Sequence, residues 1–259
     1  MSDPKLAFNS VPALYDRCRP VYPDEVYEDI FAYMNTPASD AVCLEIGIGT
    51  GQATRPVLLS GASVTAVEIG ADLAAYTQNK YAEYPALSVV NCAFEDFTGT
   101  ENGFDLIYSA SAFHWIPEEV GYPKVYSLLR PGGVFARFAN HPSPDKRRPK
   151  LCDAIQELYA IYMPGSHPAG EYTDDMAANR AAIAEKYGFV DISHHLYYGR
   201  RDFTAAAYTA LLGTYSDHLA IPEPRRTEFF AAIEDTINAH GGTFTVYDTV
   251  DLQLAKKMS

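Results

Sequence analysis

Residues 42–53, VCLEIGIGTGQA, decide how the rest of this 259-residue sequence is interpreted. Residues 42–46 form a short, predominantly apolar run with a β-branched residue at each end, which is typical of a buried parallel strand. Gly47, Gly49 and Gly51 follow, and residues 52–60 then have the pattern of a helix. A glycine turn between a strand and a helix brings backbone N–H groups and a helix N-terminus close to a ligand. The stretch therefore predicts a cradle for a nucleotide.

Two interpretations of the glycines compete, and position 52 separates them. The dinucleotide fingerprint G-x-G-x-x-G/A needs a small residue there, because helix and strand pack closely at that point. Position 52 is Gln, and Glu45 stands two residues before the first glycine. This form, E-x-G-x-G-x-G, resembles the first motif of the class I S-adenosylmethionine-dependent methyltransferases. The glycine loop alone is a weak signal, so the following strands have to agree with it.

A second strand is expected over residues 63–69, SVTAVEI, with Glu68 near its end. A carboxylate about 20 residues after the loop, at the end of the adjacent strand, can accept hydrogen bonds from both ribose hydroxyls of a nucleotide. That spacing fits a dinucleotide site equally well, and an ordinary solvated acid is the third interpretation. Residues 72–84 are expected to form the next helix.

The third and fourth strands carry the rest of the resemblance. Residues 87–92, LSVVNC, precede a corner at which such methyltransferases bind adenine, and residues 104–116, FDLIYSASAFHWI, closely resemble the fourth strand of the methyltransferase type-11 subgroup. The turn LLRPGG at 128–133 is a further family marker and leads into a fifth strand, 134–140. Together these ordered markers imply a Rossmann-like α/β fold: a seven-stranded, mostly parallel sheet with helices on both faces, an antiparallel final strand and a helical insertion that forms a substrate cap.

The resemblance implies a set of site residues. His114 is the candidate catalytic base, because it is the titratable side chain that directly follows the fourth strand; positioning of Trp115 is its alternative role. The residues expected to bind the cofactor come from the opening segment and from the ends of the first four strands. They are Tyr15, Arg19, Glu45, Gly47, Ile48, Gly49, Gly51, Gln52, Glu68, Ile69, Ala93, Phe94, Glu95, Ser109 and Ala110.

The opening segment, residues 8–22, has prolines and aromatic side chains but little apolar periodicity. It is similar to the start of type-11 methyltransferases, where this part folds over the cofactor. The resemblance implies a lid that closes over the ligand, with Tyr15 and Arg19 at its methionine end; a fixed strap over the sheet is the alternative.

Beyond residue 140 the sequence carries no motif. Residues 141–149, HPSPDKRRP, are expected to be a basic loop, either solvated or guiding an anionic substrate, and Gly188 is expected to end a helix over 174–187. We expect one domain over 1–259: a lid and helix at 1–36, a cofactor core at 40–140, a helical cap from 141–187 and 203–240, and a final strand pair at 188–200 and 243–256.

Composition limits the partners. The formal net charge of −13 disfavours phosphate backbones and anionic membranes, so neither nucleic acid nor a membrane is expected. The four cysteines are scattered, which argues against zinc or a disulfide framework and fits a reducing compartment. The expectation is a cytoplasmic monomer or homodimer that binds no metal and acts on a small molecule.

Three functions stay open at this point. The first is methyl transfer from S-adenosylmethionine to O, N or C of a small molecule, with S-adenosylhomocysteine as product. The second is a nicotinamide-dependent oxidoreductase, which Gln52 and the Pro-Gly-Gly turn oppose. The third is a cofactor-binding protein of the same fold without catalysis.

Overall fold

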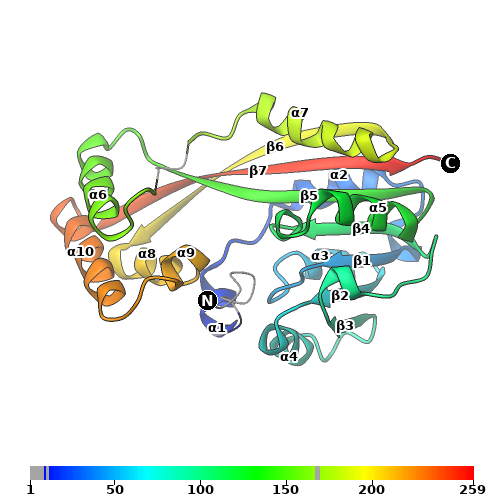
Figure 1. The fold of residues 1–259 in the computed structure, drawn as a ribbon, viewed down its shortest axis with the longest axis horizontal. Coiled ribbons are helices and arrows are strands. Elements are labelled where there is room, and N and C mark those ends of the chain that lie inside the picture. The colour runs from blue at the N-terminus through cyan, green and yellow to red at the C-terminus, as the bar shows by residue number, and fades with distance from the viewer. Residues whose placement is uncertain (1–8, 10–11, 167–169) are drawn as a thin grey trace. The chain divides into compact units, whose positions relative to one another are not determined.

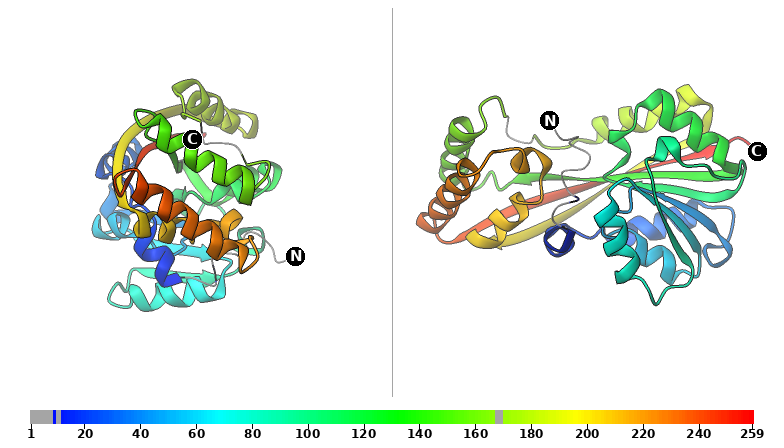
Figure 2. Two further views of the ribbon diagram at one scale, coloured as in Figure 1. Left: turned by 90° about the vertical axis from the view of Figure 1, so that its left-hand side faces the viewer. Right: turned by 60° about the horizontal axis from the view of Figure 1, so that its bottom comes forward.

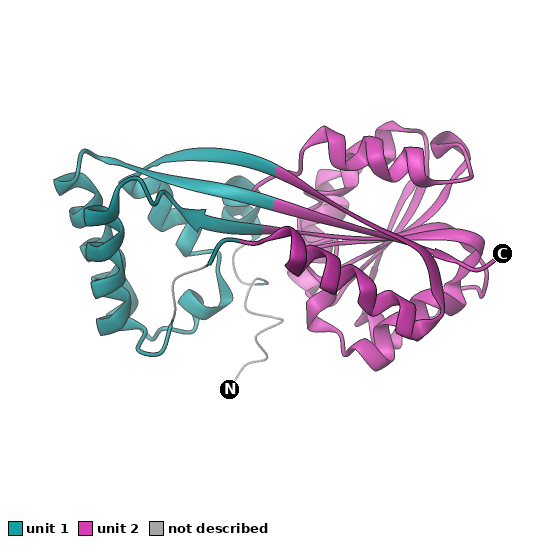
Figure 3. Cartoon of the chain, turned by 90° about the horizontal axis from the view of Figure 1, so that it is seen from above, with its two compact units in different colours: residues 1–19, 141–171, 198–249 teal, residues 20–140, 172–197, 250–259 magenta. Residues whose placement is uncertain are grey.

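The computed structural model describes residues 9, 12–166 and 170–259. The chain divides into two compact units (Figure 3). Unit 1 comprises residues 1–19, 141–171 and 198–249, and unit 2 comprises residues 20–140, 172–197 and 250–259.

A seven-stranded sheet in the order β3-β2-β1-β4-β5-β7-β6 carries the fold (Figure 1). The pairs β1–β2, β2–β3, β1–β4 and β4–β5 are parallel, and the final strand β7 is antiparallel. The long strands β5, β6 and β7 contribute residues to both units. The strands are β1 (Val42–Ile46), β2 (Ser63–Glu68), β3 (Leu87–Asn91), β4 (Phe104–Ala110), β5 (Leu129–Pro144), β6 (Phe189–Thr204) and β7 (Thr243–Lys257).

Helices cover both faces of the sheet in unit 2, as Figure 2 shows. On one face, α2 (Asp24–Tyr33) and α3 (Thr54–Leu59) bury apolar side chains in a first core. On the other, α5 (Glu118–Leu128) fills a second core. The remaining helical segments of this unit are η2 (Ala38–Asp40), α4 (Ala71–Lys80), η3 (Phe94–Asp96), η4 (Phe113–Trp115), α7 (Asp174–Ala181) and η5 (Ala182–Tyr187). The fold class predicted from the sequence is confirmed.

Local sequence explains where these elements begin and end. Strands β1 and β4 are buried along nearly their whole length, which is why their residues form short apolar runs. Gly188 ends η5 in the left-handed conformation, with φ 88°, as predicted for a glycine after a helix.

Unit 1 has a core of its own. Apolar side chains of α6 (Pro149–Tyr162), α8 (Ala205–Leu212) and α10 (Arg225–Ala239) meet those of β7, and α9 (Ser216–Leu219) follows α8. The sequence pattern predicts one helix over 204–219, but Gly213 ends α8 and a turn separates it from α9.

The opening segment contains a helix that the sequence pattern does not predict. Residues 12–18 form α1 (Pro12–Cys18), and α1 packs against α8 within unit 1. Phe8 and residues 10–11 of the predicted lid lie outside the described residues. The sequence predicts an irregular segment here, and that was wrong for residues 12–18. The expectation that its order comes from the elements it packs against agrees with the contacts between α1 and α8.

The stretch 141–149 is not a loop throughout, because β5 continues to Pro144. Its neighbour in the sheet is β7, and the Ser143 hydroxyl donates to the Tyr247 carbonyl at 3.4 Å. Pro142 and Pro144 are unusual within a strand, so the sequence pattern did not predict one here. Pairing with a neighbouring strand imposes it.

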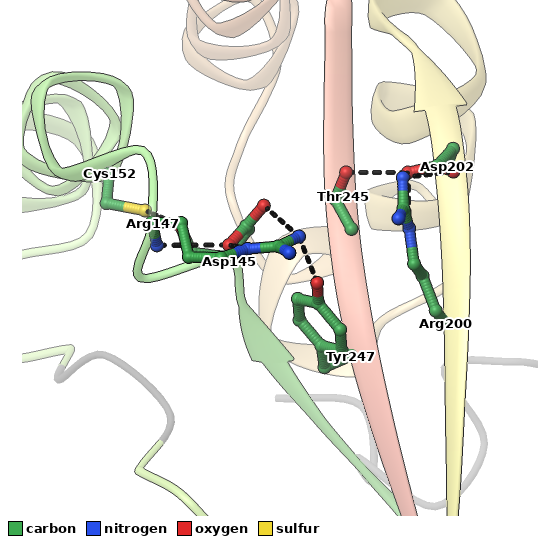
Figure 4. Close-up of polar contacts among 7 residues, drawn as sticks. All are labelled: Asp145, Arg147, Cys152, Arg200, Asp202, Thr245 and Tyr247. Carbon is green, nitrogen blue, oxygen red and sulfur yellow. Dashed lines mark hydrogen bonds and ion pairs between the residues drawn. The ribbon is translucent and has the colours of Figure 1, made fainter.

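The basic cluster that follows β5 is held by acceptors of unit 1. Arg147 donates to both carboxylate oxygens of Asp145 at 2.8 and 3.0 Å and to the Tyr247 hydroxyl (Figure 4). Arg148 donates to the Thr243 carbonyl at 2.6 Å, and Lys146 forms an exposed ion pair with Glu171 at 3.3 Å. These contacts favour a structural role over one in guiding an anionic substrate.

Candidate functional site: the glycine loop at the end of β1

Backbone conformation explains the three glycines after β1. Gly47, Gly49 and Gly51 have φ values of 75°, 57° and 81°, in the left-handed region that side chains with a Cβ disfavour. The N–H groups of Gly47 and Ile48 donate to the Val67 carbonyl of β2 at 2.9 and 3.3 Å. The loop is therefore fixed to the neighbouring strand and turns sharply.

Close packing adds a second requirement at two of these positions. A Cβ on Gly47 would lie 2.4 Å from the Cβ of Ala112, after β4, and one on Gly51 would lie 2.5 Å from the Tyr81 ring. Gly47 and Gly51 are thus needed by the protein's own packing.

Side chains of α4 and of the residue after it hold the loop carbonyls. These bonds are Thr77 Oγ1 to the Gly49 carbonyl (2.6 Å), Lys80 Nζ to the Thr50 carbonyl (2.9 Å) and Tyr81 Oη to the Gly51 carbonyl (2.7 Å). The sequence pattern does not predict any of the three. The sequence shows that this helix has a polar face, but the pattern does not distinguish polar side chains that bond to the loop from polar side chains that face solvent.

Glu68, at the end of β2, reaches the loop. Its Oε2 accepts from the Gly49 N–H at 2.9 Å and its Oε1 from the Gly70 N–H at 2.8 Å. The residue is 6% exposed, and this burial raises the pKa of its carboxyl, while the bonds from Gly70, Gly49 and Ile69 act in the opposite direction. The structure therefore brings together the loop and the acid that the sequence paired by spacing.

Glu45 is buried beneath the loop. Its Oε2 accepts from the Thr54 hydroxyl at 2.7 Å and from the Tyr108 hydroxyl at 2.8 Å, which links β1 to α3 and to β4. Burial raises the pKa of Glu45 to about 7, although both hydrogen bonds lower it. Glu45 thus braces the loop from within, and its predicted contact with a ligand stays a prediction.

Ile48 and Gln52 belong to the loop itself. Ile48 is buried in the first core, and the Gln52 amide donates to the Thr50 hydroxyl at 2.5 Å. Neither arrangement tests their predicted contacts with a cofactor.

The predicted adenine corner lies after β2 and β3. Ile69 is 36% exposed, and Ala93 precedes η3 in an extended conformation. Phe94 is buried with the Lys124 ammonium 5.2 Å from its ring centre, and that ammonium donates to the Glu95 carbonyl at 2.8 Å. The predicted contacts of these residues with adenine stay predictions.

The end of β4 borders the loop. Ser109 is buried and donates to the Ile46 carbonyl at 2.9 Å, while Ala110 is partly buried. His114 is exposed in η4, with its ring centre 4.9 Å from that of Trp115. Its role as a base stays a prediction.

A residue that the sequence motifs did not single out lies between these positions. Ser111 has φ 53°, an uncommon value for serine, and its hydroxyl bonds to the Tyr22 hydroxyl at 2.9 Å. The Tyr22 ring packs edge-on to Phe138 with centres 4.8 Å apart. The end of the predicted lid segment is thus anchored in unit 2.

Tyr15 and Arg19 belong to unit 1, whereas the other predicted cofactor residues belong to unit 2. The Arg19 guanidinium lies 4.8 Å from the Tyr15 ring centre and 4.3 Å from that of Tyr215, and it donates to the Thr214 carbonyl at 2.6 Å. Their contact with a cofactor stays a prediction.

His194 and His195 lie apart from the loop. His194 pairs with Asp174 at 3.2 Å and His195 with Asp29 at 3.8 Å. Over the described part of the chain, His, Cys, Asp and Glu side chains form no group of three suited to a metal ion. Within the same residues, no helix has the length and hydropathy of a membrane span.

Comparison with known proteins agrees with this geometry. Residues 43–133 match the family model of a methyltransferase domain. Uncharacterized methyltransferases of Mycobacterium bovis and Mycobacterium tuberculosis are 30% identical over 131 residues, which is 51% of this chain and 51% of theirs. The chain thus spans about half the length of these curated relatives.

Solved structures share the fold. A putative type II methyltransferase from Anaeromyxobacter dehalogenans superposes with a TM-score of 0.63 at 18% identity, over 93% of this chain and 98% of that one. Phosphoethanolamine N-methyltransferase 2 of Haemonchus contortus, solved with phosphomonomethylethanolamine and S-adenosylhomocysteine, gives 0.56 at 12% identity, over 97% of this chain and 58% of that one.

The sheet order and the glycine loop define the class I methyltransferase fold. The match of residues 43–133 to the methyltransferase domain model and the shared fold support the recognition made from the sequence. The distant similarity to trans-aconitate methyltransferases stays a prediction.

Proposed function

We propose that this protein is an S-adenosylmethionine-dependent methyltransferase that acts on a small molecule. One observation carries the proposal: the Glu68 carboxylate is bonded to the Gly49 N–H, so an acid and a glycine turn meet at the ends of adjacent strands. The match of residues 43–133 supports it, as does the cofactor product named in the structure of the Haemonchus enzyme.

The residues present fit the cofactor. The two Glu68 oxygens accept backbone bonds from Gly49 and Gly70, and a carboxylate has about four acceptor positions, so capacity remains for ribose hydroxyls. Ile69 and Ala93 would border the adenine, and the backbone around Gly49 would follow the methionine part. Glu95 and Phe94 are the candidates for the adenine edge.

When bound, S-adenosylmethionine supplies an electrophilic methyl group on a sulfonium. The chain's own task is then to bind, align and exclude water, since a displacement needs donor and acceptor held about 3 Å apart and in line. His114 is the candidate base for an acceptor that has to lose a proton, and it is not needed for an acceptor without one.

The acceptor side of the proposal rests on the helical cap predicted at 141–187 and 203–240. A single domain with this cap, the closing of residues 8–22, a cytoplasmic location and a monomer or homodimer are parts of the same proposal. The charge of −13 supports a small-molecule acceptor over nucleic acid.

The test is a screen of fractionated metabolite extracts for release of S-adenosylhomocysteine, with mass identification of a product that has gained one methyl group. A His114→Ala variant serves as the comparison for base catalysis. Tight cofactor binding without turnover in any fraction would favour a non-catalytic binding protein instead.

A further inference from the structure

Unit 1 contains a cavity of about 260 Å³. The end of β5, the helices α6, α8 and α9 and the start of β7 supply its walls, and all of its lining residues belong to unit 1. The cavity is distinct from the glycine loop, which belongs to unit 2.

A chain of hydrogen bonds runs along one wall. The Tyr159 hydroxyl lies 2.8 Å from His218 Nε2, and His218 Nδ1 lies 2.7 Å from Asp217 Oδ1. Tyr208, Tyr159, His218 and Asp217 all line the cavity.

Asp217, the acceptor at one end, sets the direction in which the hydrogen bonds of this chain are donated. Because Asp217 Oδ1 is an acceptor, the tautomer of His218 that fits this chain has its proton on Nδ1 and leaves Nε2 to accept from Tyr159. Burial raises the pKa of Asp217, but its bonds and charge interaction with His218 outweigh this and leave the pKa lowered, so the carboxylate is ionised. The Tyr159 oxygen, whose proton goes to Nε2, then retains acceptor capacity.

His218 is held rigidly in this chain. It is 4% exposed and its ring is stacked on Phe229 at 6.1 Å between centres, with Tyr215 5.7 Å away. Burying an imidazole costs free energy unless both of its nitrogens have hydrogen-bond partners. A network that satisfies both nitrogens next to a cavity therefore suggests a role in binding a ligand there.

The other walls are mostly apolar, with Ser143, Gln156 and Ser166 as their polar residues. Ile155, Leu211, Leu212, Phe244 and Val246 line the cavity. A cavity of about 150 Å³ with such walls binds benzene, so the larger volume here admits a two-ring molecule.

The charged residues that line the cavity disfavour an anionic ligand. None of the described residues that line the cavity is Lys or Arg, and Asp217 lines it. The Arg19 guanidinium on the Tyr215 ring donates to the Thr214 carbonyl and does not line the cavity.

We propose that this cavity is a binding site for a neutral aromatic molecule with one hydroxyl, whose rings contact the apolar walls and whose hydroxyl donates to the Tyr159 end of the Tyr159–His218–Asp217 chain. The proposal does not depend on methyl transfer, because binding is measured without cofactor.

Three probes of equal ring size test it by fluorescence titration of the full chain: 2-naphthol, naphthalene and 2-naphthoate. One neutral hydrogen bond predicts that 2-naphthol binds about three- to tenfold more tightly than naphthalene. The carboxylate of 2-naphthoate should make it the weaker of the two polar probes.

Tyr159→Phe removes the terminal oxygen and keeps the ring. It should abolish most of the preference for 2-naphthol and leave naphthalene binding unchanged. Tyr162→Phe is the matched control, because Tyr162 stacks on Phe229 in the same unit but does not line this cavity.

Circular dichroism establishes that each variant is folded, and Tyr159→Leu, which also lacks the oxygen, replaces Tyr159→Phe if the latter is not. Absence of saturable 2-naphthol binding to the wild-type chain would overturn the site. Equal affinities for 2-naphthol and naphthalene, or an unchanged preference in Tyr159→Phe, would overturn the role of the hydrogen-bonded chain.

Discussion

Replacing Glu45 by glutamine should change how the stability of unit 2 depends on pH. Glu45 is 1% exposed, and desolvation raises its pKa from 4.5 to about 7, against the bonds from Thr54 and Tyr108 and with a smaller contribution from the charge of Glu68. The folded chain therefore keeps a proton on Glu45 at pH values where the unfolded chain has lost it. This stabilisation is complete below about pH 4.5 and disappears as the pH rises through about 7.

The size of the effect follows from the pKa difference. At about 1.4 kcal/mol per pKa unit, the full loss amounts to roughly 3 kcal/mol, of which roughly 2–3 kcal/mol falls between pH 5 and pH 8. Glu45→Gln has no proton to lose. The free energy of unfolding of the variant, relative to wild type, should rise by that amount between the two pH values.

Urea unfolding at pH 5 and pH 8, followed by the fluorescence of Trp115, measures this difference, since Trp115 is the single tryptophan and belongs to unit 2. The exposed Glu83, changed to glutamine, is the matched control and should show no such shift. If the free energy of unfolding of Glu45→Gln differed from that of wild type by the same amount at pH 5 and pH 8, the argument from burial would be refuted.

Other predictions concern the loop and the opening segment. Glu68→Ala should weaken S-adenosylmethionine binding by roughly 1.5–3 kcal/mol and Glu68→Gln by less, as measured by calorimetry; unchanged affinity in both would place the ribose elsewhere. Gly51→Ala should lower the free energy of unfolding by at least about 1–2 kcal/mol for the left-handed backbone alone, with part recovered by adding Tyr81→Leu, which removes the ring that meets the new Cβ; a thermal melt equal to wild type would contradict this. Hydrogen exchange over Phe8 to Tyr22 should slow when S-adenosylmethionine is bound, and equal exchange at saturation would make the segment a fixed strap.

The parallel half of the fold was predictable because its signals are local. Each of β1, β2, β3 and β4 is a short apolar run bounded by turn residues, and the pairing of Glu68 with the loop followed from chain spacing. Gly188 likewise indicates the end of a helix by its residue type.

The remainder depends on contacts between distant residues. Helix α1 is ordered by α8, and β5 extends to Pro144 beside β7, although neither segment has the periodicity of its structure. The bonds from Thr77 and Lys80 to the loop carbonyls could not be predicted either, because exposed and bonded polar side chains look alike in a sequence.

The central claim is that the loop around Gly49 holds S-adenosylmethionine, and calorimetric titration of that ligand tests it most directly. Gly49→Val should abolish binding, because its side chain would occupy the space next to the backbone where the ligand lies. Gly165→Val is the control: Gly165, in unit 1, also has a positive φ, 90°, and a Cβ placed on it would have no atom of the described residues within 4 Å. The account predicts wild-type affinity for Gly165→Val and no measurable binding for a folded Gly49→Val, whereas wild-type affinity in Gly49→Val would contradict it.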